Sequence, residues 1–155
     1  TNHLKRKMIN LFKQATEFRK AFNQPLLNNF TRYGFLRLKL FNMQCSLIDE
    51  EAKEFLDACD TLTSDCQSQE NRTEVLKELA DLVYVCYQFA ATYNLDLDEA
   101  LDRIHKSNMS KLDDEGNPIY RRDGKVLKGD NYKPPTLDDL VAPSNTIPPE
   151  DFNVN

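Results

Sequence analysis

The chain has 155 residues, 40% of them hydrophobic, which is enough for one domain with a buried core. Its 20 basic and 25 acidic residues give a formal net charge of -5, which argues against binding to a nucleic-acid backbone or an anionic membrane. No apolar run reaches the roughly 20 residues that span a bilayer, and the N-terminal stretch lacks a small-residue cleavage site, so we expect an unexported, cytoplasmic protein.

Two amphipathic helices are predicted in the first part of the chain. Apolar residues recur at intervals of three and four from about Leu4 to Phe22, which is typical of a helix with one buried face. Pro25 then bars its continuation. The second helix is predicted from about Tyr33 to Cys59, and it ends in the polar, turn-prone stretch TLTSDCQSQENRT.

Two more helices follow that polar stretch. The third is predicted over residues 73–93, with Asn71 and Glu74 as a reciprocal N-terminal cap. It is apolar on nearly every face, so other structure must cover more than one side of it. The fourth begins at Asp96, has Glu99 as its capping partner, and runs toward HKSNMSK.

The character of the sequence changes after Lys111, where glycines and prolines accumulate and helical periodicity ends. The stretch NPIYRRDGKVLK places Asp123 and Gly124 between two short segments that contain β-formers, which predicts a small hairpin. We therefore predict an all-α fold, an antiparallel four-helix bundle with a C-terminal hairpin and irregular tail. Residues 1–112 would form the helical domain, and residues 113–155 would be a hairpin and extended tail packed on the same domain.

Acidic residues occupy positions where helical periodicity predicts buried side chains. On the second helix the apolar stripe that includes Leu47 continues to Glu51 and Glu54, and on the third helix Glu78 and Asp81 flank a buried stripe. At about 100° per residue, the two members of each pair lie about 60° apart around the helix axis. Because the polar turn lies midway between Glu54 and Glu78, the two pairs should meet at one level of an antiparallel hairpin.

Four carboxylates gathered in this way repel one another by roughly 4 kcal/mol per close pair at an effective dielectric constant near 20. Protonation of some carboxyl groups, an approaching Lys or Arg, or bound divalent cations would relieve the repulsion. All-oxygen ligation suits Mg²⁺ or Mn²⁺. A single E-x-x-E motif more often marks a solvated face, and a misjudged helix phase would turn the acids to solvent. Two facing pairs favour the metal site.

The chain resembles the all-α nucleoside triphosphate pyrophosphohydrolases, which include MazG and relatives of phosphoribosyl-ATP pyrophosphohydrolase. Their signature is E-E-x-x-E followed by E-x-x-D, and here EEAKE spans residues 50–54 and ELAD spans residues 78–81. HKSNMSK and DGKVLKGDNYKPP are similar to the substrate-binding end and tail of MazG-like proteins from bacteria and bacteriophages. The resemblance covers about residues 4–137 and implies a bundle of the MazG type in a bacterial cell or a phage-infected host.

The resemblance implies metal-dependent hydrolysis of a (deoxy)nucleoside triphosphate between its α and β phosphates, which gives the monophosphate and pyrophosphate. It assigns two or more Mg²⁺ ions per site, with Mn²⁺ as an alternative, to four ligands: Glu51, Glu54, Glu78 and Asp81. Glu50 then remains, about 40° from Glu54 around the axis, which suits a catalytic base that takes a proton from the attacking water. A plain surface acid is the alternative for Glu50.

Substrate-binding residues are predicted in three places. Asn108 and Lys111 share a helix face, so both could reach one phosphate or sugar. Four tail residues could close over the substrate: Lys125, Lys128, Asn131 and Tyr132. The first helix and the following loop resemble the family's base-side wall, where a ring stacks on the base and an amide reads its edge: Phe18, Phe22, Asn23 and Gln24. Solvated lysines and core phenylalanines are the alternatives.

The base remains open, and dGTP or GTP and dUTP are the first candidates for an enzyme that controls a nucleotide pool. We expect a homodimer or a dimer of dimers, because the apolar third helix would pack against another subunit. The rival functions are a phosphoribosyl-ATP pyrophosphohydrolase and a non-catalytic helical interaction module. A di-iron bundle needs two E-x-x-H pairs, and neither His3 nor His105 follows a Glu at that spacing.

Overall fold

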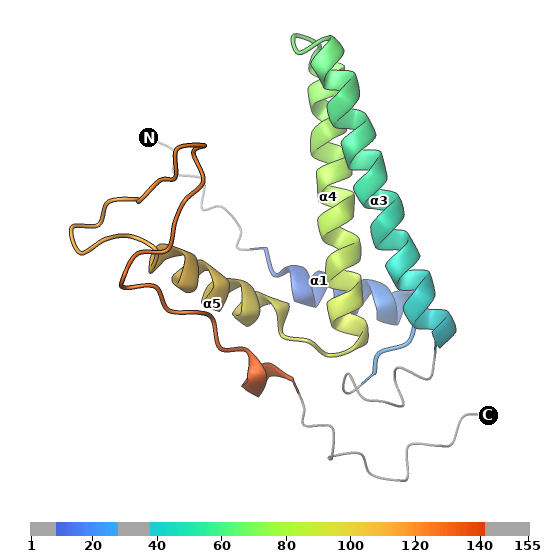
Figure 1. Ribbon diagram of the computed structural model, residues 1–155. Helices are drawn as coiled ribbons and strands as arrows, with labels where there is room; N and C mark the ends of the chain where they lie inside the picture. The colour runs from blue at the N-terminus through green and yellow to red at the C-terminus, as the bar shows by residue number, and fades with distance from the viewer. Residues whose placement is uncertain (1–8, 28–37, 142–155) are drawn as a thin grey trace, which may run out of the picture. The chain divides into compact units, whose positions relative to one another are not determined.

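The computed structural model describes residues 9–27 and 38–141. Within these ranges the chain forms four α-helices and one 3-10 helix (Figure 1). They are α1 (Leu11–Ala21), α3 (Leu38–Ser64), α4 (Gln69–Thr92), α5 (Leu97–Met109) and η1 (Asp138–Leu140). The predicted all-α fold is confirmed, since these ranges contain no β-strand. None of the described helices is long and apolar enough to cross a membrane.

Side-chain caps determine where α1 and α5 begin. Asn10 accepts a hydrogen bond from the Lys13 amide at 2.7 Å, so α1 begins several residues later than its periodicity predicted. On α5, Asp96 accepts a hydrogen bond from the Glu99 amide at 3.0 Å, which confirms the predicted N-terminus.

The boundaries of α3 and α4 differ more from the prediction. The predicted start at Tyr33 lies outside the described residues, and α3 continues into the polar stretch as far as Ser64. The N-terminus of α4 is capped by Ser68, whose hydroxyl accepts a hydrogen bond from the Asn71 amide at 3.1 Å. The predicted cap formed by Asn71 and Glu74 is therefore wrong, because both residues lie inside the helix.

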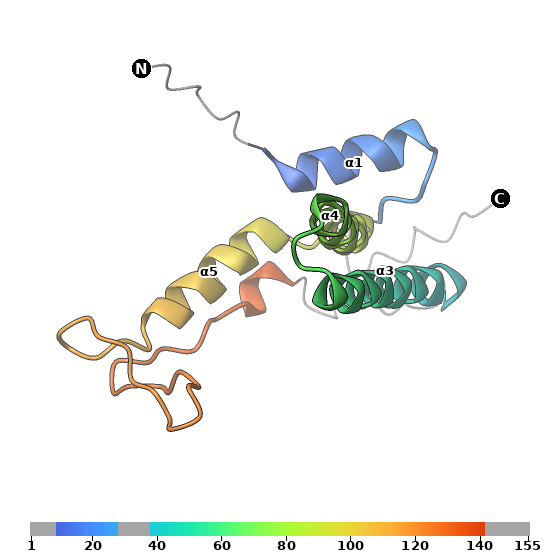
Figure 2. The ribbon, with the colours of Figure 1, turned by 90° about the horizontal axis from the view of Figure 1, so that it is seen from above.

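The chain divides into two compact units, and the division falls between α4 and α5. In the first unit, α3 and α4 form an antiparallel hairpin, and α4 lies between α3 and α1 (Figure 2). The buried hydrophobic residues of the described chain are Ala15 of α1 together with Tyr87, Ala90, Ala91 and Tyr93 at the C-terminal end of α4. Helices on two sides of α4 thus explain much of its apolar character.

Parts of the predicted apolar stripes remain exposed in the single chain. On α3, Met43 is 52% exposed and Leu47 is 39% exposed. On α4, Leu76 is 67% exposed, and Leu79 and Val83 are also open to solvent. The periodicity of α3 predicted a buried apolar stripe, but in the single chain this stripe is partly open to solvent. Association with a second subunit through α4 stays a prediction.

In the second unit, the segment that ends in η1 runs back along α5. The Ser107 hydroxyl donates a hydrogen bond to the Lys133 carbonyl at 2.7 Å, and the Lys133 amide donates one to the Ser110 hydroxyl at 2.9 Å. Near η1, the Arg103 guanidinium binds the Asp139 carboxylate through both of its terminal nitrogens. The packing of residues 113–155 on the helical domain stays a prediction.

The predicted hairpin between α5 and this segment takes a minimal form. Tyr120 and Val126 form an isolated antiparallel bridge, and the Leu127 amide donates a hydrogen bond to the Ile119 carbonyl at 2.7 Å. Gly124 at the turn has a φ of 84°, a left-handed conformation that favours glycine. The turn residues predicted from the DG pair are thus in place, although no regular strand forms.

Candidate metal and substrate site

Three acidic side chains from α3 and α4 meet between the two helices. Glu51 and Glu54 project from α3 and Glu78 from α4, and one carboxylate oxygen from each residue lies within 4.8 Å of the others. We call these three residues the acid cluster. The structure thus brings together three of the four predicted metal ligands, one pair on α3 and the first acid of the pair on α4.

Glu78 is the buried member of the acid cluster, with 5% of the residue exposed. Its Oε1 atom lies 2.5 Å from the Lys77 ammonium, whereas its Oε2 atom is buried without a hydrogen-bond partner among the described residues. The hydrogen bond from Lys77 lowers the pKa of Glu78. A buried carboxylate oxygen without a partner costs free energy unless a cation or a donor reaches it.

The electrostatics of Glu51 involve every acid of the two motifs. Desolvation raises the pKa of Glu51 first, and the negative charges of Glu54, Asp81, Glu78 and Glu50 raise it further. Each of these charges therefore lies close enough to oppose ionisation of Glu51. Without a counter-ion, this arrangement destabilises the folded chain.

The two remaining motif acids lie at the edge of the acid cluster. The Asp81 side chain is 48% exposed, and its Oδ2 atom lies 3.4 Å from the Lys77 ammonium. Glu50 is exposed on α3. Neither completes the group of oxygens within 4.8 Å, but the side chain of Asp81 could reach a cation there by a change of rotamer.

The acid cluster fits a hard divalent cation. All of its donors are carboxylate oxygens, the ligands that Mg²⁺ and Mn²⁺ prefer. A bound cation would give the Oε2 atom of Glu78 the partner that it lacks among the described residues. It would also neutralise the negative charges that raise the pKa of Glu51. Glu51, Glu54 and Glu78 could therefore hold such an ion, with Asp81 as a further ligand.

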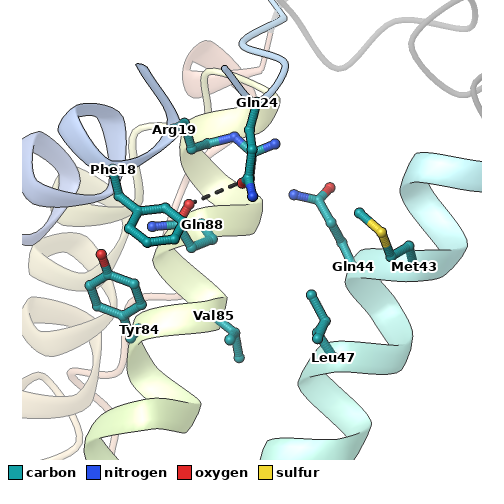
Figure 3. Close-up of a pocket in the computed structure, with 9 residues that line it drawn as sticks. All are labelled: Phe18, Arg19, Gln24, Met43, Gln44, Leu47, Tyr84, Val85 and Gln88. Atoms are coloured by element: carbon teal, nitrogen blue, oxygen red, sulfur yellow. Dashed lines mark hydrogen bonds between the residues drawn. The ribbon is translucent and has the colours of Figure 1, made fainter. Parts of the chain in front are cut away.

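A cavity of about 230 Å³ lies between α1, α3 and α4 (Figure 3). Phe18 of α1 and Tyr84 of α4 form one wall, with their ring centroids 5.8 Å apart and the rings nearly perpendicular. Met43 and Leu47 form the opposite wall on α3. Leu47 stands about one helical turn before Glu51, so the lining of the cavity ends about one turn along α3 from the acid cluster.

Buried polar side chains line the cavity and bind one another. Arg19 donates a hydrogen bond to Gln88 Oε1 at 3.4 Å, and Gln88 Nε2 donates one to the Ala15 carbonyl at 3.5 Å. Gln44 Nε2 donates a hydrogen bond to Thr92 Oγ1 at 2.5 Å. The Thr92 hydroxyl in turn donates to the Gln88 carbonyl at 2.8 Å. These residues, including Gln44 at 4% exposed, are nearly inaccessible to water.

The network fixes which amide atom of Gln44 is free. Because the Thr92 hydroxyl gives its proton to a carbonyl, it can only accept from Gln44, which must therefore present its NH₂ group. The Oε1 atom of Gln44 is buried and has no hydrogen-bond partner in the described structure. Figure 3 shows the nitrogen of Gln44 directed across the cavity, so a ligand there would reach the oxygen only after the amide group turns.

The predicted base-side residues separate into two groups. Phe18 and Gln24 line the cavity. Phe22 is 64% exposed and stacks on Phe18 at a centroid distance of 4.4 Å, and Asn23 follows the helix end with a φ of 52°. The sequence reasoning missed the buried polar residues of the cavity. The sequence pattern that could have revealed them is a polar residue at a helix position where the periodicity predicts a buried side chain. Three residues fit this pattern: Arg19, Gln44 and Gln88.

Four of the predicted substrate-binding residues gather in the second unit. The Lys111 ammonium donates a hydrogen bond to Asn108 Oδ1 at 2.7 Å, and Lys128 Nζ lies 4.3 Å from the centroid of the Tyr132 ring. A hydrogen bond with Ser107 lowers the pKa of Tyr132, and the charges of Lys128 and Lys111 lower it further. We call Asn108, Lys111, Lys128 and Tyr132 the basic patch.

The other two predicted tail residues bind elsewhere within the same unit. Asn131 Nδ2 donates a hydrogen bond to Asp114 Oδ1 at 2.6 Å. Lys125 belongs to the hairpin turn, where its amide donates a hydrogen bond to Asp123 Oδ1 at 3.2 Å. The structure shows no side-chain hydrogen bond of either residue with the basic patch within the described part of the chain.

Sequence reasoning also missed two charged residues next to the acid cluster on α4, Lys77 and Glu74. Lys77 precedes Glu78 directly and stands four residues before Asp81, a spacing at which opposite charges pair on a helix. A hydrogen bond with Glu78 raises the pKa of Glu74. The sequence spacing was a sufficient signal for the Lys77–Asp81 pair.

Comparison with known proteins supports the resemblance in the helical region. No curated protein matches the chain significantly. The sequence profile of the family described as phosphoribosyl-ATP pyrophosphohydrolase matches residues 15–108, which is more than half of the chain and contains all five motif acids. The chain belongs to the phosphoribosyl-ATP pyrophosphohydrolase family, within the superfamily of MazG-like nucleoside triphosphate pyrophosphohydrolases.

Proposed function

We propose that the chain hydrolyses a (deoxy)nucleoside triphosphate between its α and β phosphates and thereby controls a nucleotide pool. Family membership supports pyrophosphohydrolase activity on a nucleotide-type substrate. The observation that carries the proposal is the acid cluster, in which three carboxylate oxygens lie within 4.8 Å of one another, about one turn along α3 from a cavity lined by aromatic and amide groups.

Glu51, Glu54 and Glu78 would hold the cation, and Asp81 would complete its ligands. Held by these carboxylates, Mg²⁺ or Mn²⁺ would lower the pKa of water and neutralise negative charge on the phosphates. Glu78 contributes most to the position of the site, since its buried side chain is held by Lys77 and has one oxygen open. Glu51 contributes a carboxylate whose ionised form a cation would stabilise, since four neighbouring acids disfavour it.

Glu50 is the proposed catalytic base. It is exposed at the edge of the acid cluster, and its charge acts on Glu51. A carboxylate there can accept the proton of a water molecule that attacks the phosphorus atom. Its exposure also lets it release the proton to solvent after the reaction.

The cavity is the proposed base site. Gln44 and Glu51 are two helical turns apart on α3, or roughly 10 Å at 1.5 Å per residue. This separation is comparable with the distance from the edge of a base to the phosphates of the same nucleotide. Phe18 offers a ring face or edge to the base, and Gln44 Oε1 would accept a hydrogen bond from a base N–H group once the amide turns toward the cavity.

The basic patch is proposed to bind phosphate oxygens. Lys111 and Lys128 supply positive charge, and Asn108 and the Tyr132 hydroxyl supply further hydrogen-bond donors. Asn131 stays in the proposal as a residue whose side chain would first leave Asp114, and Lys125 stays as a lysine of the hairpin turn, where its backbone amide is bound.

Phosphoribosyl-ATP is the second candidate substrate, and the family profile itself favours it. The same bond between the α and β phosphates would be cleaved. The acid cluster would act alike in both reactions, so the two candidates differ in what the cavity accepts.

A panel of ribonucleoside and deoxynucleoside triphosphates, together with phosphoribosyl-ATP, tests the proposal. Each is incubated with the protein and Mg²⁺ or Mn²⁺, and pyrophosphate and monophosphate are separated chromatographically. We expect pyrophosphate from one or two bases, with dGTP or GTP and dUTP tested first. Release from phosphoribosyl-ATP alone would support the second candidate. Release of single phosphate, or no release by a folded protein that binds Mn²⁺, would contradict both.

A further inference from the structure

Lys77 places a positive charge against three acidic residues of α4. Its Nζ atom lies 2.5 Å from Glu78 Oε1, 3.4 Å from Asp81 Oδ2 and 3.9 Å from Glu74 Oε1. Two of these acids are proposed metal ligands. The ammonium group therefore occupies the side of the acid cluster where a divalent cation would also find negative charge.

The contact with Glu78 is unusual for a helix. Glu74 and Asp81 precede and follow Lys77 by three and four residues, so their contacts are ordinary pairs on the helix surface. Consecutive residues point about 100° apart and do not face each other. The Glu78 side chain is 6% exposed and that of Lys77 is 56% exposed. The lysine stem must therefore fold inward from the surface to reach the buried carboxylate.

Lys77 satisfies Glu78 only in part. One carboxylate oxygen accepts from the ammonium, and the other is buried without a partner among the described residues. A divalent cation on Glu51, Glu54 and Glu78 could bind this second oxygen, but it would then face the ammonium across the same carboxylate. Two cations so close repel each other, so the ion and the ammonium compete for Glu78.

We propose that Lys77 is an internal counter-ion of the metal site, which holds Glu78 and Asp81 in the metal-free chain and leaves them when a divalent cation binds. This inference rests on the proposed function, since it needs the acid cluster to bind metal. Glu74 provides the place to which the ammonium moves, because its carboxylate already lies within 3.9 Å and is outside the acid cluster. Lys77 is thus a positioning residue whose removal has opposite effects on the metal-free and metal-bound chain.

Mn²⁺ titration followed by electron paramagnetic resonance tests the competition, with the full chain as wild type, Lys77→Met and Lys53→Met. Lys53 is the matched control, since it lies exposed within the EEAKE motif and forms no ion pair in the described structure. Both variants lose one positive charge near the acids, but only Lys77→Met removes the contact with Glu78. We expect Lys77→Met to bind Mn²⁺ about three- to tenfold more tightly than Lys53→Met.

Thermal unfolding in EDTA provides a measurement that needs neither metal nor turnover. Without Lys77 the carboxylates of Glu78 and Asp81 lose their counter-ion, so Lys77→Met should unfold at a lower temperature than Lys53→Met. Lys77→Arg keeps the positive charge, so its Mn²⁺ affinity and its unfolding temperature should both stay close to those of wild type. Lys77→Gln repeats the comparison with a polar side chain if the methionine variant does not fold.

The outcomes separate this inference from the proposed function. Equal Mn²⁺ affinities for Lys77→Met and Lys53→Met would show that only net charge matters and would overturn the inference. Weaker binding by Lys77→Met would overturn it as well, because Lys77 would then assist the ion. A wild-type chain that binds no Mn²⁺ would refute the metal site and the inference together, whereas normal turnover with equal affinities would refute the inference alone.

Discussion

Glu54 of α3 and Glu78 of α4 approach each other across the antiparallel hairpin, with carboxylate oxygens within 4.8 Å. A carboxylate oxygen of Glu51 also lies within 4.8 Å of both, although every other acid of the two motifs disfavours the ionised form of Glu51. A protein selected only for stability would avoid this arrangement, because like charges in a partly desolvated site repel one another. The acid cluster is therefore best explained by a ligand that carries positive charge.

Glu54→Gln should lower kcat at least about 100-fold while the helices stay folded, because the amide is a weaker cation ligand of nearly the same shape. Pyrophosphate release measures the activity, and far-ultraviolet circular dichroism measures the fold. Asp60→Asn, at an exposed position of the same helix, removes the same charge and should retain activity. Full turnover by Glu54→Gln would exclude this residue from the metal site.

Glu51→Gln should stabilise the metal-free chain. Desolvation and four neighbouring acids raise the pKa of Glu51, so its ionised form costs folding free energy at pH 7, and the amide removes that cost. In EDTA we expect the variant to unfold at a higher temperature than wild type. Added Mn²⁺ should raise the unfolding temperature of wild type more than that of the variant. A variant less stable than wild type in EDTA would contradict the electrostatic argument.

The hairpin that carries the acid cluster was predictable from the sequence. Helical periodicity placed α3 and α4, and the polar stretch between them determined which residues lie at the same level. Glu54 and Glu78 are about equally far from that turn, so their proximity followed from helix geometry alone. The cap at Ser68 did not follow, because Asn71 and Glu74 also had the spacing of a cap and periodicity could not choose between them.

The cavity was much less predictable. Its shape depends on where α1 crosses α4, and this crossing is determined by side-chain packing that periodicity does not describe. Arg19 and Gln88 read as isolated polar residues in the sequence, and only their contact in space shows that they satisfy each other. The free oxygen of Gln44 depends on one further residue, Thr92, which lies far away in the sequence.

Gln44→Leu and Gln44→Glu separate base reading from packing. The leucine removes the free acceptor, so KM should rise about 3- to 10-fold, the value of one hydrogen bond. The glutamate keeps an acceptor oxygen but cannot donate to Thr92 Oγ1 and buries a charge, so it should lower the unfolding temperature and report the packing of the network. A substrate analogue methylated on the base N–H group should bind wild type more weakly, but it should not be disfavoured further by Gln44→Leu. Additive losses in this cycle would show that Gln44 does not contact that group.

Lys111→Ala should raise KM or lower kcat about 10-fold without a change in Mn²⁺ affinity, because the ammonium is proposed to bind phosphate and not the metal ligands. Steady-state kinetics and Mn²⁺ titration measure the two quantities separately. Lys106→Ala is the control, since Lys106 lies in the last turn of α5, shortly before Lys111, and pairs with Asp102. Wild-type kinetics for Lys111→Ala would place the phosphates elsewhere, and equal defects in both variants would indicate a general charge effect.

The Arg103–Asp139 pair should make the return segment along α5 sensitive to acid. Arg103 lowers the pKa of Asp139, so the pair contributes stability above the ordinary aspartate pKa, and this contribution is lost as the pH falls through the lowered value. Hydrogen exchange at the Lys133 and Leu140 amides, both hydrogen-bonded in this unit, reports whether the segment stays docked. At pH 7, Asp139→Asn should exchange faster at these amides than wild type, and its neighbour control Asp138→Asn should not. Equal protection in the two variants would mean that the backbone hydrogen bonds to Ser107 and Ser110 hold the segment without the ion pair.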